Sequence, residues 1–183
     1  MDILPALFPA KLVAVCAPGA AREPIAHLTA ALALCGSLTV LDGGNRFQPY
    51  RVAQLLRQKT TRVDQAARNI FIRRAFTCYQ MLALLETTPA LRQPYLVLDL
   101  LATFYDEHVR EREAHRLLDA CLRELERLSR GAPVVVSLSP VLLAERAFLV
   151  ESVCARAGHV FSLAAPAPVE AQLSLFPGTP PGC

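Results

Sequence analysis

An aspartate that directly follows a short apolar run is the residue of this chain best placed to do chemistry. The run is Tyr95-Leu96-Val97-Leu98, and the acid is Asp99. Such a run is typical of a central strand that is buried on both faces of a parallel sheet. Ligands bind at the carboxyl edge of open α/β sheets, where an acid can hold the Mg²⁺ of a bound nucleotide. Asp99 is therefore either a metal-binding acid or, in the reading we favour, a cap or a buried acid that accepts hydrogen bonds.

Short apolar runs alternate with amphipathic stretches along the chain, and the strands and helices that they form must position Asp99. This alternation predicts an α/β fold with a parallel or mixed sheet and helices on both faces. The strands are expected at residues 11–16, 38–41, 70–73, 95–98, 133–137 and 159–163. The helices are expected at residues 25–34, 49–58, 79–86, 108–130 and 141–157.

The composition fits a folded protein rather than a disordered one. The chain has 183 residues, of which 53% are hydrophobic, and its formal net charge is +3. The six cysteines include no C-x-x-C pair, which favours free thiols in a reducing compartment. No apolar run is long enough to span a bilayer and the first residues lack a basic leader, so we expect a cytoplasmic protein without membrane contact.

Four stretches together resemble the RecA-fold recombinases, most closely the RadA-type branch and its paralogues. They are residues 41–52, 69–76, 96–104 and 134–139, and the resemblance covers roughly residues 11–163. It implies a RecA-like, mostly parallel sheet with helices on both faces. We divide the chain into a domain at residues 1–165 and a flexible, Pro-rich tail at residues 166–183.

The nucleotide site implied by this resemblance is degenerate. A phosphate-binding loop needs a lysine and a hydroxyl at its end, but these positions hold Glu23 and Pro24. The catalytic glutamate falls on Gly44, and a later glutamine falls on Ser139. One surviving acid cannot support phosphoryl transfer, so we expect a pseudo-ATPase with no enzymatic activity, cofactor or metal. The degenerate site comprises Gly19, Glu23, Pro24, Gly44 and Asp99.

The tail contains a short apolar segment that resembles the pentapeptide by which bacterial polymerases and repair proteins bind the sliding clamp. It consists of Gln172, Leu173, Ser174, Leu175 and Phe176. Leu175 and Phe176 would be the apolar anchors of an extended peptide in a preformed pocket. The alternative is a structural tail, because the same alternation of apolar and polar residues suits an edge strand.

Arginines that could contact nucleic acid fall into two groups. The first group consists of Arg62, Arg68, Arg73 and Arg74. The second consists of Arg110 and Arg112, near the start of the long helix. Acidic residues lie beside the second group, and scattered arginines are commonly a solvated surface.

The leading hypothesis is a non-catalytic accessory protein of bacterial DNA repair or translesion replication, comparable to the ImuA-type relatives of RecA. It would be tethered to the sliding clamp and would dock a recombinase or an error-prone polymerase subunit. The alternatives are a DNA-binding module of the recombinase-paralogue kind and a surviving ATPase with an unusual site.

Overall fold

The chain folds around a six-stranded sheet in which all strands are parallel. The computed structural model describes residues 12–106, 108–140 and 146–163. The strands run in the order β3-β2-β4-β5-β1-β6, so the α/β class with a parallel sheet is confirmed. Their bounds are β1 Leu12–Cys16, β2 Leu38–Asp42, β3 Ile70–Arg74, β4 Tyr95–Leu98, β5 Val134–Leu138 and β6 His159–Ser162.

Burial of the strands follows their place in the sheet. The inner strands β2, β4 and β5 are buried at every position, which explains their nearly continuous apolar sequences. The outer strands β3 and β6 are largely exposed. Parallel strands also bring all their carboxyl ends to one edge, and that edge includes Asp99 at the end of β4.

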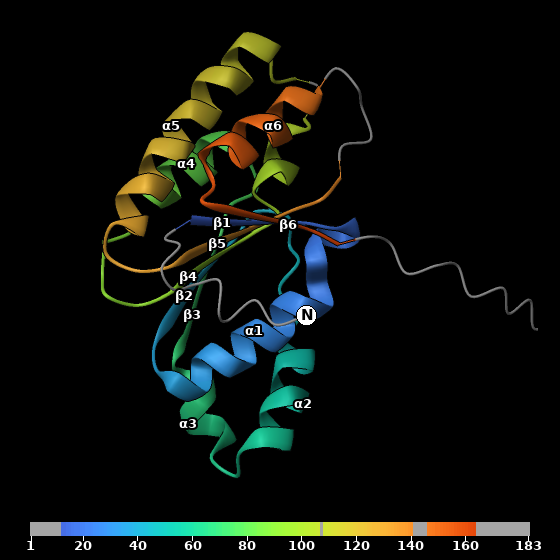
Figure 1. Ribbon diagram of the computed structural model, residues 1–183. Coiled ribbons are helices and arrows are strands. Elements are labelled where there is room, and N and C mark those ends of the chain that lie inside the picture. Colours follow the sequence, from blue (N-terminus) through green and yellow to red (C-terminus); the bar gives the residue numbers. More distant parts are fainter. Residues whose placement is uncertain (1–11, 107, 141–145, 164–183) are drawn as a thin grey trace, which may run out of the picture.

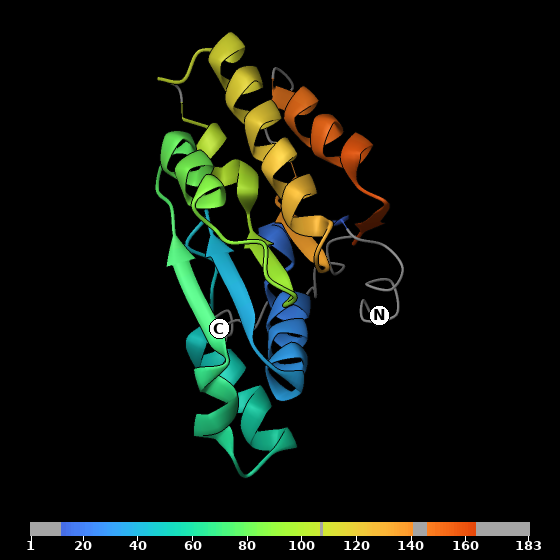
Figure 2. The same ribbon diagram turned by 90° about the vertical axis from the view of Figure 1, so that its left-hand side faces the viewer.

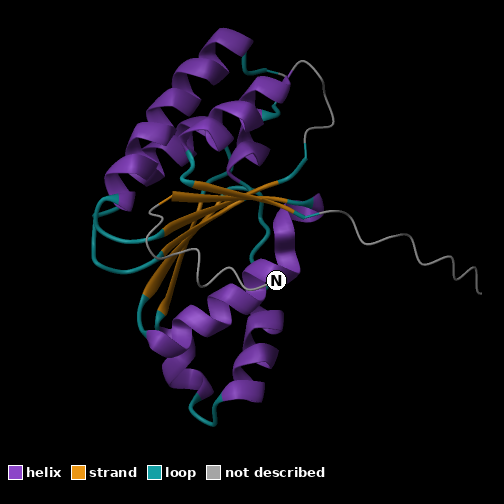
Figure 3. Cartoon of the chain, in the orientation of Figure 1, coloured by secondary structure: helices purple, strands orange, loops and turns teal. Residues whose placement is uncertain are grey.

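Helices cover both faces of the sheet, as Figures 1 and 3 show. The helices α1, α2 and α3 lie on one face, and α4, α5 and α6 lie on the other. Two short 3₁₀ turns, η2 and η3, follow β1 and β4. The helices span α1 Arg22–Cys35, α2 Pro49–Lys59, α3 Val63–Arg68, α4 Cys78–Glu86, α5 Glu111–Ser129 and α6 Ala147–Arg156, and the turns span η2 Pro18–Ala21 and η3 Leu100–Phe104.

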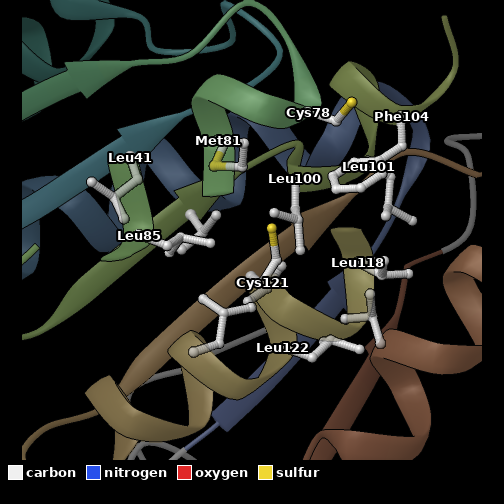
Figure 4. Close-up of a cluster of buried hydrophobic side chains, with 14 of the residues drawn as sticks. Leu41, Cys78, Met81, Leu85, Leu100, Leu101, Phe104, Leu118, Cys121 and Leu122 are labelled. Atoms are coloured by element: carbon white, nitrogen blue, oxygen red, sulfur yellow. The ribbon is translucent and has the colours of Figure 1, made fainter. Parts of the chain in front are cut away.

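Two hydrophobic clusters, one on each face, hold these layers together. In the cluster on the α4–α6 side, Met81 and Leu85 of α4 lie beside Leu41 of β2, and Leu100 lies between α4 and Cys121 of α5 (Figure 4). Burial of apolar side chains is the main favourable term in folding. The two clusters therefore hold the strands in place, and the strand ends position the loops at the carboxyl edge.

The structure differs from the sequence prediction mainly at helix ends. The helix expected from residue 108 begins at Glu111, because Arg110 is extended with φ −61° and ψ 145°. Of the helix expected at residues 141–157, the described part is Ala147–Arg156. Helix α3 was not predicted, because six residues are too short to show helical periodicity.

Two further sequence expectations concern the cysteines and a membrane span. The five cysteines among the described residues are all free. Within the same described residues, no helix is both long enough and apolar enough to cross a bilayer.

Candidate functional site

Asp99 lies at the carboxyl edge of the sheet and is almost fully buried. Its side chain is 1% exposed, and its backbone adopts a left-handed conformation with φ 48°. Its Oδ2 accepts hydrogen bonds from Arg46 Nε at 2.7 Å and from Ser139 Oγ at 3.0 Å. Its Oδ1 accepts one from Ser139 N at 3.2 Å. Both carboxylate oxygens are therefore already bound by the protein.

A second buried acid, Asp42 at the end of β2, positions the arginine that binds Asp99. Asp42 is fully buried and accepts hydrogen bonds from the backbone N–H groups of Arg46 at 2.8 Å and Phe47 at 3.2 Å. Arg74 Nε lies 3.4 Å from its Oδ2. A short acidic side chain that binds N–H groups a few residues ahead commonly folds a turn. Here that turn places the Arg46 guanidinium over Asp99.

We define Asp42, Arg46, Asp99 and Ser139 as the carboxyl-edge cluster. It combines residues from the ends of β2, β4 and β5, which are adjacent in the sheet. Because Arg46 balances the charge of Asp99, a metal ion would have to displace the guanidinium to reach this carboxylate. Over the described part of the chain, no group of three or more His, Cys, Asp or Glu residues is arranged to hold a metal.

Gly44 leaves no room for a side chain. A Cβ atom at this position would lie 2.6 Å from Asp99 Cβ and 2.8 Å from Asp99 Oδ2. The resemblance places the catalytic glutamate at this position. A glutamate side chain could be accommodated here only if Asp99 moved. The close packing of residue 44 against Asp99 therefore excludes a base at this position.

The segment that the resemblance places at a phosphate-binding loop has an unusual backbone. Gly19, Ala20 and Ala21 have φ angles of 60°, 55° and 54°. Two successive alanines in the left-handed region are uncommon, because their Cβ atoms approach backbone oxygens there. Helix α1 then begins at Arg22, three residues before the expected start at residue 25, with Pro24 in its first turn.

Glu23, at the expected lysine position, is held by an ion pair on the surface. The Arg51 guanidinium from α2 donates from Nε to both carboxylate oxygens at 2.9 and 3.0 Å, and from Nη2 to Oε1. The same oxygen, Oε1, lies 3.1 Å from His27 Nε2. The hydrogen bonds from Arg51 hold the pKa of Glu23 below its ordinary value. A phosphate approaching the start of α1 would therefore meet a carboxylate that stays ionised at neutral pH.

The candidate DNA-binding arginines remain two separate groups. Arg62 directly precedes α3 and Arg68 is its last residue, whereas Arg73 and Arg74 end β3. Arg110 and Arg112 instead line a hollow of about 420 Å³ at the start of α5, together with Glu113 and Arg116. Glu113 and Arg116 form a two-pronged ion pair at 2.9 and 2.7 Å. The acids in and beside this hollow offset much of its positive charge.

Sequence reasoning singled out Asp99 and Glu23 but missed their partners. Arg46 and Arg51 were seen only as part of a sequence pattern, and Ser139 only as a missing glutamine. The turn signal at residues 42–44 could have indicated a sharp reversal, but not which side chain it brings to Asp99. The clamp-like segment, Gln172 to Phe176, lies outside the described residues.

The Arg46–Asp99 pair should contribute measurably to stability. Arg46→Ala leaves the buried carboxylate without its cation and should lower the free energy of unfolding by about 2 kcal/mol. In an Asp99→Asn background, where residue 99 no longer carries a charge for Arg46 to balance, the same substitution should cost less than about 0.5 kcal/mol. Urea denaturation of the four proteins measures both values. Equal costs in the two backgrounds would contradict the pairing.

The close approach at Gly44 leads to a second prediction. Gly44→Ala should lower the free energy of unfolding by about 2 kcal/mol or more, because its methyl group overlaps Asp99. Gly131→Ala is the matched control, since its Cβ would lie 3.6 Å from Leu91 O, an ordinary contact. That substitution should change stability by no more than about 1 kcal/mol. A smaller loss at Gly44 than at Gly131, measured by urea denaturation, would refute the packing argument.

No protein-family model matches the chain, and no curated protein matches it either.

Proposed function

We propose that the chain is a non-catalytic accessory protein of bacterial DNA repair or translesion replication. Its RecA-like core acts as a pseudo-ATPase scaffold, and its tail tethers the scaffold to the sliding clamp. The core's protein partner is a recombinase or an error-prone polymerase subunit. The working compartment is the cytoplasm.

The observation that carries the pseudo-ATPase part is the contact between Arg46 Nε and Asp99 Oδ2 at 2.7 Å. The acid that would hold Mg²⁺ instead binds a cation that belongs to the protein. Gly44 cannot accommodate a base, and Glu23 repels phosphate where a lysine would attract it. Phosphoryl transfer depends almost entirely on positioned positive charge and an oriented nucleophile. Each of these requirements is opposed by a specific residue.

The recombinase resemblance gains support from the way the sheet is assembled. The resembling stretches include residues of β2, β3, β4 and β5, and the carboxyl ends of these parallel strands lie at one edge of the sheet. Asp42, Asp99 and Ser139 from three of these stretches are linked through hydrogen bonds to Arg46 or to each other. Stretches that are separate in sequence thus form one site, as a degenerate nucleotide site requires.

The clamp part of the proposal rests on the tail sequence from Gln172 to Phe176. Two adjacent apolar anchors lie in a segment bounded by prolines, and prolines disfavour a sheet interior. Tethering works through effective concentration, so a weak peptide is sufficient to hold a scaffold near a replication or repair complex.

Substituting the two anchors tests this tether. Leu175→Ala with Phe176→Ala should weaken binding of the full chain to a bacterial sliding clamp by more than about tenfold, because buried anchors dominate such interfaces. Thr179→Ala, outside the pentapeptide, is the matched control and should bind like the wild type. Calorimetry with the full chain and with a peptide of residues 169–178 measures these affinities. Unchanged binding by the double variant would refute the motif.

A DNA-binding module is the second candidate, and the clustering of basic residues around α3 and β3 favours it. The leading proposal predicts no strong binding of a labelled single-stranded oligonucleotide at physiological salt, measured by fluorescence anisotropy. Tight binding that falls steeply with salt would support the second candidate instead. Arg62→Glu with Arg68→Glu should then abolish that binding, and Arg110→Glu with Arg112→Glu should not.

A further inference from the structure

Two cysteines that are far apart in the sequence lie side by side in the structure. Cys16 ends β1, and Cys154 lies in the last turn of α6. Their sulfur atoms are 3.8 Å apart, within the range of a hydrogen bond between thiols, although 138 residues separate them along the chain. Both residues are half-buried. Each thiol therefore has a second thiol within reach.

The backbone of Cys16 is fixed from both sides. It pairs with Leu138 of β5 and with Ser162 of β6, and its C=O accepts a hydrogen bond from Leu163 N at 2.9 Å. Its side chain packs against the hydrophobic cluster on the α4–α6 side of the sheet. Cys16 therefore presents a sulfur atom of defined position to the helix that covers this end of β1.

Helix α6 supplies the second sulfur atom and is held less firmly. Of its ten residues, Leu149 and Val153 are the two that are buried, and they pack into the same hydrophobic cluster. A further contact joins it to α5, where His115 stacks on Phe148 with ring centroids 3.7 Å apart. Figure 2 shows α6, in orange, beside α5 and leading into β6. A helix with so few buried side chains is able to open locally.

The two sulfur atoms need only a small movement to form a disulfide. The S–S bond is about 2.0 Å long, so the sulfur atoms must approach by about 1.8 Å. A change of side-chain rotamer in Cys154 and a slight shift of α6 can supply this approach. The helix is the partner that moves, because the backbone of Cys16 is fixed within the sheet.

The environment of Cys16 decides the order in which the two thiols react with an oxidant. The thiolate is the nucleophile in such reactions. Burial, together with the neighbouring Cys154 thiol, raises the pKa of Cys16 to about 12, so Cys16 is protonated at neutral pH. Cys16 is therefore suited to a second step, in which it attacks an already oxidised partner and its close approach offsets a low fraction of thiolate.

The other described cysteines are poorly placed to compete. Cys35 is exposed but ends α1, which covers the opposite face of the sheet. Cys78 and Cys121 are fully buried in the core, and burial raises the pKa of both thiols. An oxidant that arrives from solvent therefore reaches the half-buried pair more easily than it reaches these two thiols.

We propose that Cys16 and Cys154 are a modification site, at which a hydroperoxide oxidises the two thiols to an intramolecular disulfide. The Cys154 thiolate attacks one peroxide oxygen, the O–O bond breaks, and hydroxide leaves and takes up a proton. The product is a sulfenic acid on Cys154. Cys16 then attacks the sulfenic sulfur, the S–O bond breaks, and hydroxide leaves with the Cys16 proton as water. With hydrogen peroxide, the two thiols are oxidised and the peroxide is reduced to two waters.

The disulfide converts a lightly held helix into a covalently fixed one. It closes a loop between residues 16 and 154, and such a cross-link restrains the opening of the segments that it joins. In a reducing compartment the pair rests as two thiols, as in the structure, and a thiol reductant restores this state after oxidation. This inference uses neither the tail nor the proposed partners, so it can fail without affecting the proposed function.

Peptide mapping of the full-length protein after treatment with hydrogen peroxide tests the proposal. Free thiols are alkylated, and trypsin then releases residues 12–22 and 147–156, each of which contains a single cysteine. The two peptides should be recovered joined by a disulfide, and dithiothreitol should separate them. Cys154→Ser should abolish the linked species, whereas Cys35→Ser, the matched control, should leave it unchanged.

Two further measurements examine the order of the steps and the effect on α6. In Cys16→Ser, where no second thiol is in place, dimedone should label a sulfenic acid on Cys154. In Cys154→Ser, dimedone should leave Cys16 unlabelled. Amide hydrogen exchange of α6 should be slower by about tenfold or more in the oxidised wild type than in the reduced protein.

Several outcomes would overturn the proposal. These are the absence of the linked species, a disulfide that joins Cys16 or Cys154 to another cysteine, or a linked species that survives Cys154→Ser. Dimedone on Cys16 instead of Cys154, or equal exchange of α6 in the two redox states, would likewise contradict it. Should Cys154→Ser fail to fold, Cys154→Ala removes the same thiol with an apolar side chain and decides the same question.

Discussion

The ion pair between Asp99 and Arg46 is the constraint on which the carboxyl edge depends. Asp99 is buried at the end of a central strand, and a buried carboxylate is costly unless it is paired and hydrogen-bonded. Arg46 supplies the charge and Ser139 supplies two further donors. The turn after β2 must fold so that the guanidinium arrives there. Gly44 must lack a side chain because that turn passes within contact distance of Asp99.

The same interaction is the one on which the proposed pseudo-ATPase role rests. A nucleotide site needs acids that are free to hold a metal ion and cations that are free to hold phosphate. Here Arg46 occupies the acid, and Arg51 is bound to Glu23 at the start of α1. The positive and negative side chains that could otherwise bind a ligand form ion pairs with each other. Stability of the edge and chemistry at the edge therefore compete for the same side chains.

Because the charged side chains at the carboxyl edge are already paired with each other, the surface features that could contact a partner lie elsewhere. One such feature is the outer strand β3, which is apolar in its middle and basic at its end. In the function proposed above the chain is a scaffold. A protein of this kind would act by holding partners together, and its effect would depend on effective concentration.

The sequence by itself determined the fold class and the order of its elements. Runs such as Tyr95–Leu98 are apolar throughout, and α5 repeats its leucines every three or four residues, so local periodicity was sufficient. It also identified Asp99 as the acid at the edge of the sheet. Only the tertiary structure decided what surrounds that acid. Arg46 and Ser139 lie 53 and 40 residues away along the chain, and their contact follows from strand order and turn geometry. The exposure of Phe71 and Ile72 was likewise set by the position of β3 at the end of the sheet, which no local pattern encodes.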